Sequence, residues 1–225
     1  MVSTLYIIAT PIGNASDITE RAVRTLSSVS AILAEDTRVT HKLLSLLGIR
    51  KGLIAWHEHS DARAWERIRV LLAGGSDLCY VTDAGTPGVS DPGGRLIELV
   101  RKELPDVHIV PIPGPSALAA AISVAGIPLS EFLFLGFLPH KKGRQTALHE
   151  IAQSARPVIL FESVHRIRKL LAELAESKMR VVVCRELTKK FETVYRGTAA
   201  EVLEALTAME TKGEFVVIAH RYDRT

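Results

Sequence analysis

The chain has 225 residues, 47% of them hydrophobic and 24% charged, and this ordinary globular composition excludes a disordered or fibrous protein. The net charge of +3 permits contact with RNA without requiring it, so the placement of the basic residues matters more than their number. Neither a basic leader nor an apolar run of about 18 residues occurs, and the two cysteines are isolated, so we expect a cytoplasmic protein with no membrane segment.

Short apolar runs alternate with segments of helical periodicity along the first half of the chain. Such alternation is typical of a mostly parallel sheet covered by helices. Asp17, with Glu20 three residues later, predicts a capping box at one helix start, and Asp61 predicts the N-cap of another. The strands expected here are Leu5–Ala9, Ala31–Ala34, Leu53–Trp56, Leu78–Thr82 and Val107–Ile112.

The alternation restarts after residue 128. Strands are expected at Phe132–Phe137, Val158–Phe161, Val181–Cys184 and Glu214–Ala219, and helices at Gln145–Ser154, Val164–Ala175 and Ala199–Ala208. Prolines and glycines concentrate between residues 113 and 128 with no polar linker, so we place a hinge between packed domains there. The predicted fold is α/β, with two α/β domains and mostly parallel sheets, over residues 1–115 and 116–225.

The most informative segment is Asp83–Gly94, a loop with four glycines and two prolines that follows an expected strand. A plain β–α turn is one interpretation, but such a connection needs only a few residues. Glycine lets a backbone approach a ligand closely, and the Asp83 carboxylate can accept hydrogen bonds from a ribose or an ammonium group. The nucleotide motifs G-x-G-x-x-G and G-x-x-x-x-G-K-[ST] do not occur here, so neither nicotinamide nor ATP binding is indicated.

Two further loops, Thr10–Asn14 and Pro113–Ser116, also follow strands of the first half. Loops after parallel strands emerge at one edge of the sheet, so we expect the three loops to line one pocket. Glu35–Arg38 lies at the same edge, where an N-capped helix start with Asp36 as the cap explains the segment about as well as a functional role does.

Charged segments follow strands in the second half as well, at Glu162–Arg166 and Arg185–Lys190. They are either site residues or solvated helix starts. His57-Glu58-His59 lacks a third ligand at a suitable spacing, so we interpret it as a solvated loop and expect no metal site.

Eight motifs occur in the order found in a known family. They are Thr10–Asn14, Glu35–Arg38, Asp83–Gly93, Pro113–Ser116, Gly136–Pro139, Phe161–Ser163, Arg185–Lys189 and Gly213–Val217. Together they resemble the bacterial ribosomal RNA small-subunit methyltransferases of the tetrapyrrole methylase superfamily, over nearly the whole chain. No single motif is decisive, but eight in order are highly specific.

The resemblance implies a tetrapyrrole-methylase-like homodimer that binds S-adenosylmethionine in the cleft between the two domains and 2′-O-methylates a cytidine ribose of small-subunit (16S) ribosomal RNA. The cofactor contacts that it implies are Pro11, Asp83, Gly85, Thr86, Pro87, Val89, Ser90, Ser116, Ala117 and Phe161. Members of the family continue past the final strand into a small helical segment that is not in this sequence. If that segment grips RNA, weaker RNA binding is expected.

A ribose hydroxyl is a weak acid, so a general base adds roughly 10²–10⁴-fold to the rate of its methylation. The candidates for the base are Glu186, Asp36 and His165, while Lys189 or Arg185 is suited to stabilise the developing alkoxide. Catalysis by positioning alone is also open. We take Glu186, Lys189 and Asp36 as the expected catalytic residues.

Basic residues concentrate in the expected loops of the second half, where they are suited to phosphate contacts unless they are simply solvated. The expected RNA contacts are Arg38, Lys141, Arg144, His165, Arg166 and Arg185.

Two other functions remain open for the chain. One is a methylase of the same fold that acts on a tetrapyrrole or corrin ring. The other is a non-catalytic ribosome-binding factor, which would bind RNA regardless of the cofactor. The basic loops and Glu35–Arg38 favour the RNA methyltransferase.

Overall fold

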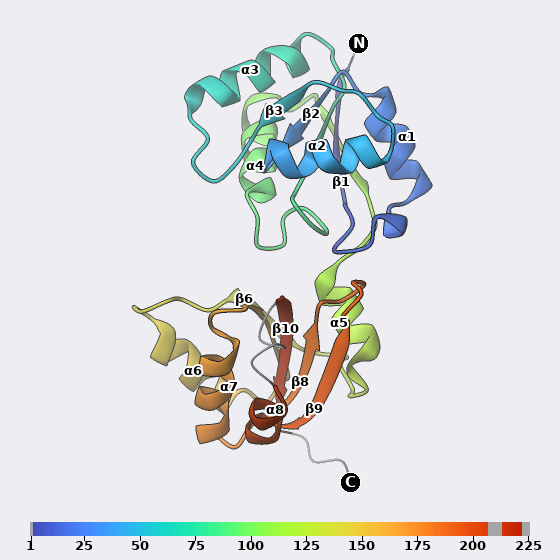
Figure 1. The fold of residues 1–225 in the computed structure, drawn as a ribbon. Coiled ribbons are helices and arrows are strands. Elements are labelled where there is room, and N and C mark those ends of the chain that lie inside the picture. The colour runs from blue at the N-terminus through green and yellow to red at the C-terminus, as the bar shows by residue number, and fades with distance from the viewer. Residues whose placement is uncertain (1, 207–212, 222–225) are drawn as a thin grey trace. The chain divides into compact units, whose positions relative to one another are not determined.

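The computed structural model describes residues 2–206 and 213–221 and divides into two compact units, Met1–Ser116 and Ala117–Thr225 (Figure 1). Each unit contains one five-stranded sheet with helices packed on it. None of the helices in the described part of the chain is long and apolar enough to span a membrane.

The N-terminal unit is a parallel sheet in the order β3-β2-β4-β1-β5, and all its strand pairs are parallel, as predicted. Its strands are β1 (Thr4–Ile8), β2 (Ala31–Ala34), β3 (Leu53–Ala55), β4 (Leu78–Val81) and β5 (His108–Ile112). Its helices are the 3₁₀ turn η1 (Ala15–Asp17), α1 (Glu20–Ser28), α2 (Thr37–Leu46), α3 (Ala62–Ala73) and α4 (Gly93–Glu103). The parallel prediction succeeded because β4 is buried along its whole length, the pattern of a strand covered on both faces.

Helices cover both faces of this sheet. Residues of α3 and α4, such as Ile68 and Leu96, share one apolar cluster with β1 and β4, while Leu26 of α1 and Leu44 of α2 share the other. Asp61 caps α3 through its carboxylate, as predicted. The predicted cap at Asp17 is wrong, because residues 15–17 form η1 and the hydroxyl of Thr19 caps α1 instead.

The order of the strands marks one place in the sheet where a ligand is expected. From β1 the chain crosses to β2 on one side, and from the neighbouring β4 it crosses to β5 on the other side. Open α/β sheets bind ligands at such a switch point, outside the carboxyl ends of the strands. The loops after β1 and β4 are therefore the first place to look for a site.

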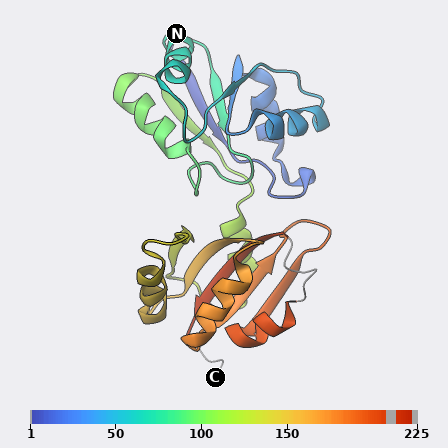
Figure 2. The same cartoon turned by 60° about the vertical axis from the view of Figure 1, so that its left-hand side comes forward.

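The C-terminal unit has the strand order β6-β7-β10-β8-β9. Its strands are β6 (Leu133–Phe137), β7 (Val158–Ser163), β8 (Arg180–Arg185), β9 (Thr193–Thr198) and β10 (Glu214–His220). Its helices are α5 (Ala117–Ala125), α6 (Arg144–Gln153), α7 (Ile167–Glu176) and α8 (Ala199–Ala205). The core side of the sheet packs against α6, α7 and α8, while α5 contacts β10 (Figure 2).

The prediction of a mostly parallel sheet is wrong for this unit, because only β6 and β7 pair in parallel and the other three pairs are antiparallel. The cause is β9, a strand that the sequence did not predict. The connection from Glu186 to Glu192 is too short for a crossover, so β9 returns antiparallel to β8. The crossover through α8 then brings β10 in antiparallel to β8. The predicted end of the helix 199–208 lies outside the described residues.

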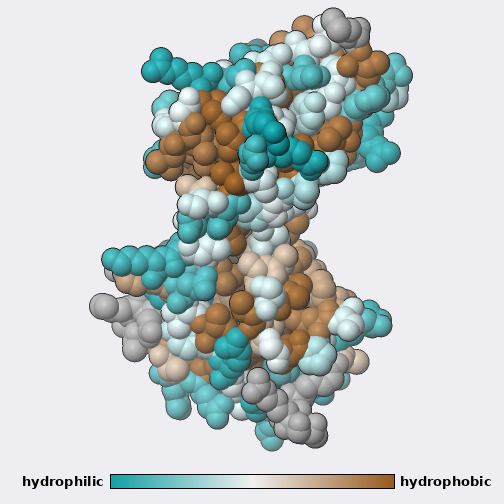
Figure 3. Space-filling model, turned by 90° about the vertical axis from the view of Figure 1, so that its right-hand side faces the viewer, coloured by the Kyte–Doolittle hydropathy of each residue, from teal (hydrophilic) through white to brown (hydrophobic). Residues whose placement is uncertain are grey.

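Some large apolar side chains remain at the surface of both units (Figure 3). Val39 and Leu46 of α2 and Val70 of α3 are exposed in the N-terminal unit, and Phe137 and Phe191 are exposed in the C-terminal unit. Clusters of such side chains, unlike single ones, mark binding surfaces.

Candidate active site

The loops after β1 and β4 are joined to each other at the switch point. The Thr10 N–H donates to the Gly85 carbonyl at 2.9 Å, and the Gly85 N–H donates to the Thr10 carbonyl at 3.0 Å. The Thr10 hydroxyl also donates to the Thr82 carbonyl at 3.2 Å. These bonds fix the two loops in one arrangement.

The third predicted loop, Pro113–Ser116, also contacts the loop after β4. The Thr86 hydroxyl donates to the Pro115 carbonyl at 3.0 Å, and a Cβ on Gly85 would lie 3.3 Å from Cγ2 of Ile12. Gly85 also has a φ of +85°, which side chains other than glycine rarely adopt. The prediction that the three loops lie together is confirmed by these contacts.

Asp91 organises the loop after β4, and sequence reasoning did not select it. One carboxylate oxygen accepts the N–H groups of Gly88 and Val89, and the other accepts the Gly93 N–H at 2.7 Å. Gly93 has no room for a side chain, because a Cβ would lie 2.9 Å from both Asp91 Oδ1 and Tyr80 Cε1. An Asp placed between glycines is the usual signal of such a turn, and it was present in the sequence.

Carboxylates gather at the ends of β2 and β4. Glu35 Oε2 accepts the Thr82 hydroxyl at 2.6 Å and the Asp83 N–H at 3.1 Å. The Asp36 N–H donates to Asp83 Oδ1 at 3.0 Å, and no hydrogen bond among the described residues uses Asp83 Oδ2. Asp83 is exposed, so a carboxylate oxygen is available at this edge.

The two aspartates have opposite pKa shifts. The Arg38 guanidinium hydrogen-bonds to Asp36 and lowers the pKa of that carboxyl to about 2. Burial, and then the neighbouring Glu35 carboxylate, raise the pKa of Asp83. A carboxyl with a raised pKa holds a proton more tightly and is the better hydrogen-bond partner for an exchangeable ligand group.

The predicted cofactor residues of the N-terminal unit differ in exposure. Asp83 and Ser90 are exposed, Pro11, Thr86, Val89 and Ser116 are half-buried, and Gly85 and Pro87 are buried. The buried pair is part of the loop's interior, and the side chains of the others are at least partly accessible. Ala117 opens α5 and Phe161 lies in β7, where its ring contacts Phe134 and Phe137 edge-on at centroid distances of 5.0 and 5.7 Å.

The expected catalytic pair of the C-terminal unit is an ion pair. Lys189 Nζ lies 2.8 Å from both Glu186 Oε1 and Glu214 Oε2, and Glu186 Oε1 also accepts the Glu214 N–H. Burial alone would raise the pKa of Glu186, but the hydrogen bonds from Lys189 and from the Glu214 backbone outweigh it and lower that pKa. Paired in this way, Glu186 is a weak base.

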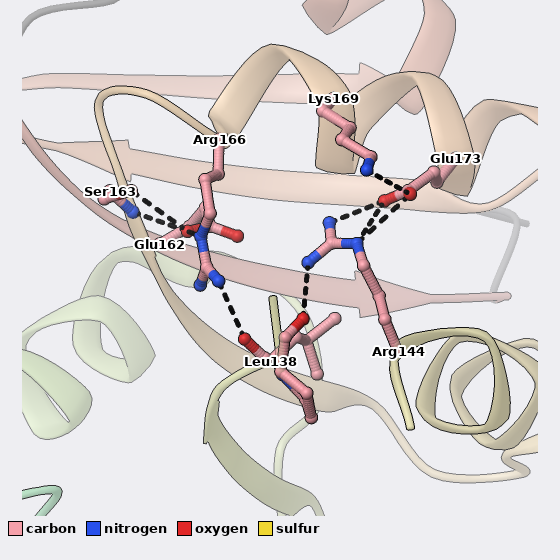
Figure 4. Close-up of polar contacts among 8 residues, drawn as sticks. Leu138, Arg144, Glu162, Ser163, Arg166, Lys169 and Glu173 are labelled. Atoms are coloured by element: carbon pink, nitrogen blue, oxygen red, sulfur yellow. Dashed lines mark hydrogen bonds and ion pairs between the residues drawn. The ribbon is translucent and has the colours of Figure 1, made fainter. Parts of the chain in front are cut away.

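Two of the predicted RNA contacts are internal (Figure 4). Arg144 is 4% exposed and forms a fork with Glu173, with a shortest N–O distance of 2.6 Å. Arg166 donates to Glu162 Oε1 at 2.7 Å and to the Leu138 carbonyl at 2.8 Å. Arg144 is held through Nε, Nη1 and Nη2, and Arg166 is held through Nε and Nη1. Neither side chain is more than 14% exposed, so the predicted contact with RNA does not fit their burial.

The other predicted RNA contacts differ from one another. Arg185 is buried, and Nη1 donates to the Phe191 carbonyl at 3.2 Å. Lys141, His165 and Arg38 are exposed, which leaves them accessible to a polyanion. The predicted RNA contacts therefore differ in burial. Their positions in predicted loops did not indicate which side chains would be buried.

The family model described as Tetrapyrrole (Corrin/Porphyrin) Methylases matches residues 4–203. The chain belongs to the tetrapyrrole methylase family. Two solved structures share the fold of the family. The methyltransferase CobJ has a TM-score of 0.69 and is 17% identical, with 98% of this chain and 97% of that chain covered. The cobalt precorrin-4 methyltransferase CbiF has a TM-score of 0.64 and is 19% identical, with 96% of this chain and 94% of that chain covered.

Within the tetrapyrrole methylase family, the similar curated proteins are named ribosomal RNA small subunit methyltransferase I. The protein of Xylella fastidiosa is 46% identical over 96% of this chain and 80% of its own length. Those of Neisseria meningitidis serogroup B and Escherichia coli O157:H7 are 43% and 42% identical, over 96% and 95% of this chain and 76% of their own lengths. The predicted resemblance and enzyme class are confirmed.

Within the described ranges, no group of three or more His, Cys, Asp and Glu side chains is placed to hold a metal ion. The carboxylates at the ends of β2 and β4 are instead held by hydroxyl and backbone donors, such as Thr82 and the N–H groups of Asp36 and Asp83.

Proposed function

We propose that this chain transfers a methyl group from S-adenosylmethionine to the 2′-oxygen of a cytidine ribose in the small-subunit ribosomal RNA. One observation carries the proposal: a relative named for this class of reaction is 46% identical over 96% of the chain. The switch-point loops support it, because they build a ligand site where this fold class binds ligands.

The loops of the N-terminal unit fit the cofactor chemically. S-adenosylmethionine supplies the methyl group on a sulfonium, together with a ribose and an ammonium group. Asp83 presents an unused carboxylate oxygen to such donors, and Gly85 lets the loop after β4 pack closely against Ile12. The proposed cofactor residues are those that the resemblance implied: Pro11, Asp83, Gly85, Thr86, Pro87, Val89, Ser90, Ser116, Ala117 and Phe161.

We assign the main catalytic role to alignment of the acceptor hydroxyl. Good alignment supplies up to about 7–11 kcal/mol of the barrier. Asp36 and Glu186 are both held by cationic partners that favour the carboxylate form, which weakens each as a base. Asp36, Glu186 and Lys189 therefore remain proposed site residues whose role is to help position the acceptor hydroxyl.

The RNA would be held by exposed cations. Arg38, Lys141 and His165 keep the role predicted for them, because their side chains are exposed. Arg144, Arg166 and Arg185 are not included, since protein acceptors hold their guanidinium groups and, unlike Arg38, their side chains are largely buried.

Methylation of a tetrapyrrole or corrin ring is the second candidate. The family description and the name of CbiF, a cobalt precorrin-4 methyltransferase, favour it only at the level of the superfamily, because CbiF is 19% identical to the chain. We also propose that the protein acts as a homodimer in the cytoplasm, where its RNA substrate is made. Light scattering of the purified protein tests the dimer.

The direct test is transfer of labelled methyl groups from S-adenosylmethionine to small ribosomal subunits from cells that lack this protein. Label is expected on a cytidine 2′-oxygen, and Asp83→Ala is expected to abolish it. Asp106→Ala, which removes another exposed carboxylate of the same unit, is the matched control and should leave transfer unchanged. Label on neither subunits nor free ribosomal RNA, with cofactor binding intact, would overturn the RNA assignment in favour of the ring methylase.

A further inference from the structure

Helix α2 separates two cavities of the N-terminal unit. A cavity of about 180 Å³ is lined by Val39, Leu43 and Leu46 of α2 and by residues of the loops after β1 and β4, among them Pro11 and Asp83. A second, of about 540 Å³, lies on the other side of the helix and is lined by His41, Ser45, Gly48, Arg50 and Lys51. The first is mainly apolar, whereas the second carries the basic residues Arg50 and Lys51 beside Leu44 and Ile49, so α2 presents two different chemistries.

The apolar side of α2 is a continuous stripe. Val39, Leu43 and Leu46 are spaced at i, i+4 and i+7, which places them on one line along the helix. Val39 is 38% exposed and Leu46 is 75% exposed, so the stripe is not buried against the rest of the described chain. At about 180 Å³ its cavity is smaller than the roughly 300–1,000 Å³ of pockets for drug-sized ligands, which suits a single planar ring.

The cationic side is the surface around the second cavity, formed by α2 and the segment that follows it. His41, Lys42 and Arg50 are exposed, and none of them forms an ion pair with another described residue. Lys51 is fixed by a 2.7 Å hydrogen bond from Nζ to the Val29 carbonyl. No acidic residue occurs between Asp36 and Glu58, so no acidic neighbour within this stretch of the chain offsets the charges of Lys42, Arg50 and Lys51. Figure 3 shows apolar and hydrophilic surfaces adjoining on this unit.

We propose that α2 binds a single strand of RNA, with one unpaired base in the apolar cavity and the neighbouring phosphates on the cationic side. A single-stranded polynucleotide is the ligand that requires both surfaces at once, because its bases are free to leave the stack while its backbone carries one charge per nucleotide. The inference rests on the proposed function and extends it, since it names where the strand beside the methylated nucleotide is held.

The test measures affinity for a short pyrimidine-rich RNA, without cofactor, by fluorescence anisotropy over a series of salt concentrations. Lys42→Glu/Arg50→Glu should weaken binding about tenfold or more and reduce the slope of log affinity against log salt by about two. Val39→Asp/Leu46→Asp should weaken binding about tenfold without a comparable change of slope.

Matched controls come from the same unit. Val70→Asp changes an exposed apolar residue of α3, and Arg101→Glu/Lys102→Glu reverses two exposed charges at the end of α4. Both should retain the parent affinity for RNA. All variants should retain the parent melting temperature, because every substituted side chain is exposed.

Each other outcome overturns the inference in a distinct way. Parent affinity in both α2 variants would exclude this helix as the RNA site. A monomer in place of a dimer after Val39→Asp/Leu46→Asp, with RNA affinity unchanged, would assign the stripe to a contact between copies. If the parent methylates ribosomal subunits while the α2 variants bind and methylate equally well, the inference fails and the proposed function stands. If the parent neither binds nor methylates RNA, both fail.

Discussion

The two units hold arginine and carboxylate pairs in opposite environments. The pair of Arg38 and Asp36 in the N-terminal unit has an arginine side chain that is 86% exposed, whereas the pair of Arg144 and Glu173 in the C-terminal unit has one that is 4% exposed. Exposed pairs contribute little to stability, while a buried pair cannot lose one member without leaving a charge in a poorly solvated interior. Charge at the N-terminal edge is therefore available to ligands, and charge inside the C-terminal unit fixes the fold.

The largest expected effect comes from breaking the buried pair. Arg144→Met leaves the Glu173 carboxylate, 14% exposed, without its fork partner and should lower the free energy of unfolding by about 3–5 kcal/mol. Urea unfolding measures it. Arg156→Ala is the control, because its pair with Glu131 is exposed on both sides and should cost about 1 kcal/mol or less. Equal losses in the two variants would remove the distinction between buried and exposed pairs.

The loop after β4 offers a second contrast between neighbouring residues. Gly93→Ala forces a Cβ to within 2.9 Å of Asp91 Oδ1 and Tyr80 Cε1, and it should cost about 1–3 kcal/mol of stability and weaken cofactor binding. Gly94→Ala meets no atom within 4 Å and lies in the first turn of α4, so it should be neutral or slightly stabilising. Calorimetric melting and cofactor titration check both. A stable Gly93→Ala with normal binding would show that Asp91 does not organise the site.

These contrasts also show what the sequence could predict. Local patterns were sufficient for the alternation of strands and helices and for the Asp61 cap, because each depends on periodicity or on residues close in the chain. The meeting of the three loops followed from the parallel sheet, because all loops after parallel strands emerge at the same edge. The burial of Arg144 depends on Glu173, which is 29 residues away, and no local pattern marks that pairing.

The missed strand had a different cause. Thr193–Thr198 contains the β-favouring residues Thr193, Val194 and Tyr195, but Gly197 and the short connection before it weakened the pattern. Because that one strand was missed, the predicted direction of β10 was reversed. An error in one element therefore changed the topology of a whole sheet, while the loops of the N-terminal site were unaffected.

A smaller effect is expected from the bond that ties the third loop to the edge. Thr86→Val removes the hydrogen bond from Oγ1 to the Pro115 carbonyl and should cost about 0.5–1.5 kcal/mol. Thr86→Ser keeps the hydroxyl and should restore most of the stability. Cofactor affinity is measured beside stability, because loosening this loop should weaken binding even in the well-folded protein. Unchanged affinity in both variants would mean that the third loop does not shape the ligand site.

The finest contrast is between two aspartates joined by one hydrogen bond. The pKa of Asp36 is lowered from 3.8 to about 2, so Asp36 contributes stability above pH 3.8 that is lost as the pH falls towards 2. The pKa of Asp83 is raised, so its contribution is present below pH 3.8 and is lost as the pH rises through the pKa of the folded state.

Urea unfolding over this pH range should show that Asp36→Asn flattens the loss of stability at acid pH, while Asp83→Asn is at least as stable as the parent near neutral pH. An amide oxygen can still accept the Arg38 and Asp36 N–H groups in the respective variants, so the difference isolates charge. Parallel pH profiles in the two variants would contradict the opposite environments assigned to these neighbours, and with them the reason that Asp83 is the carboxylate open to a ligand.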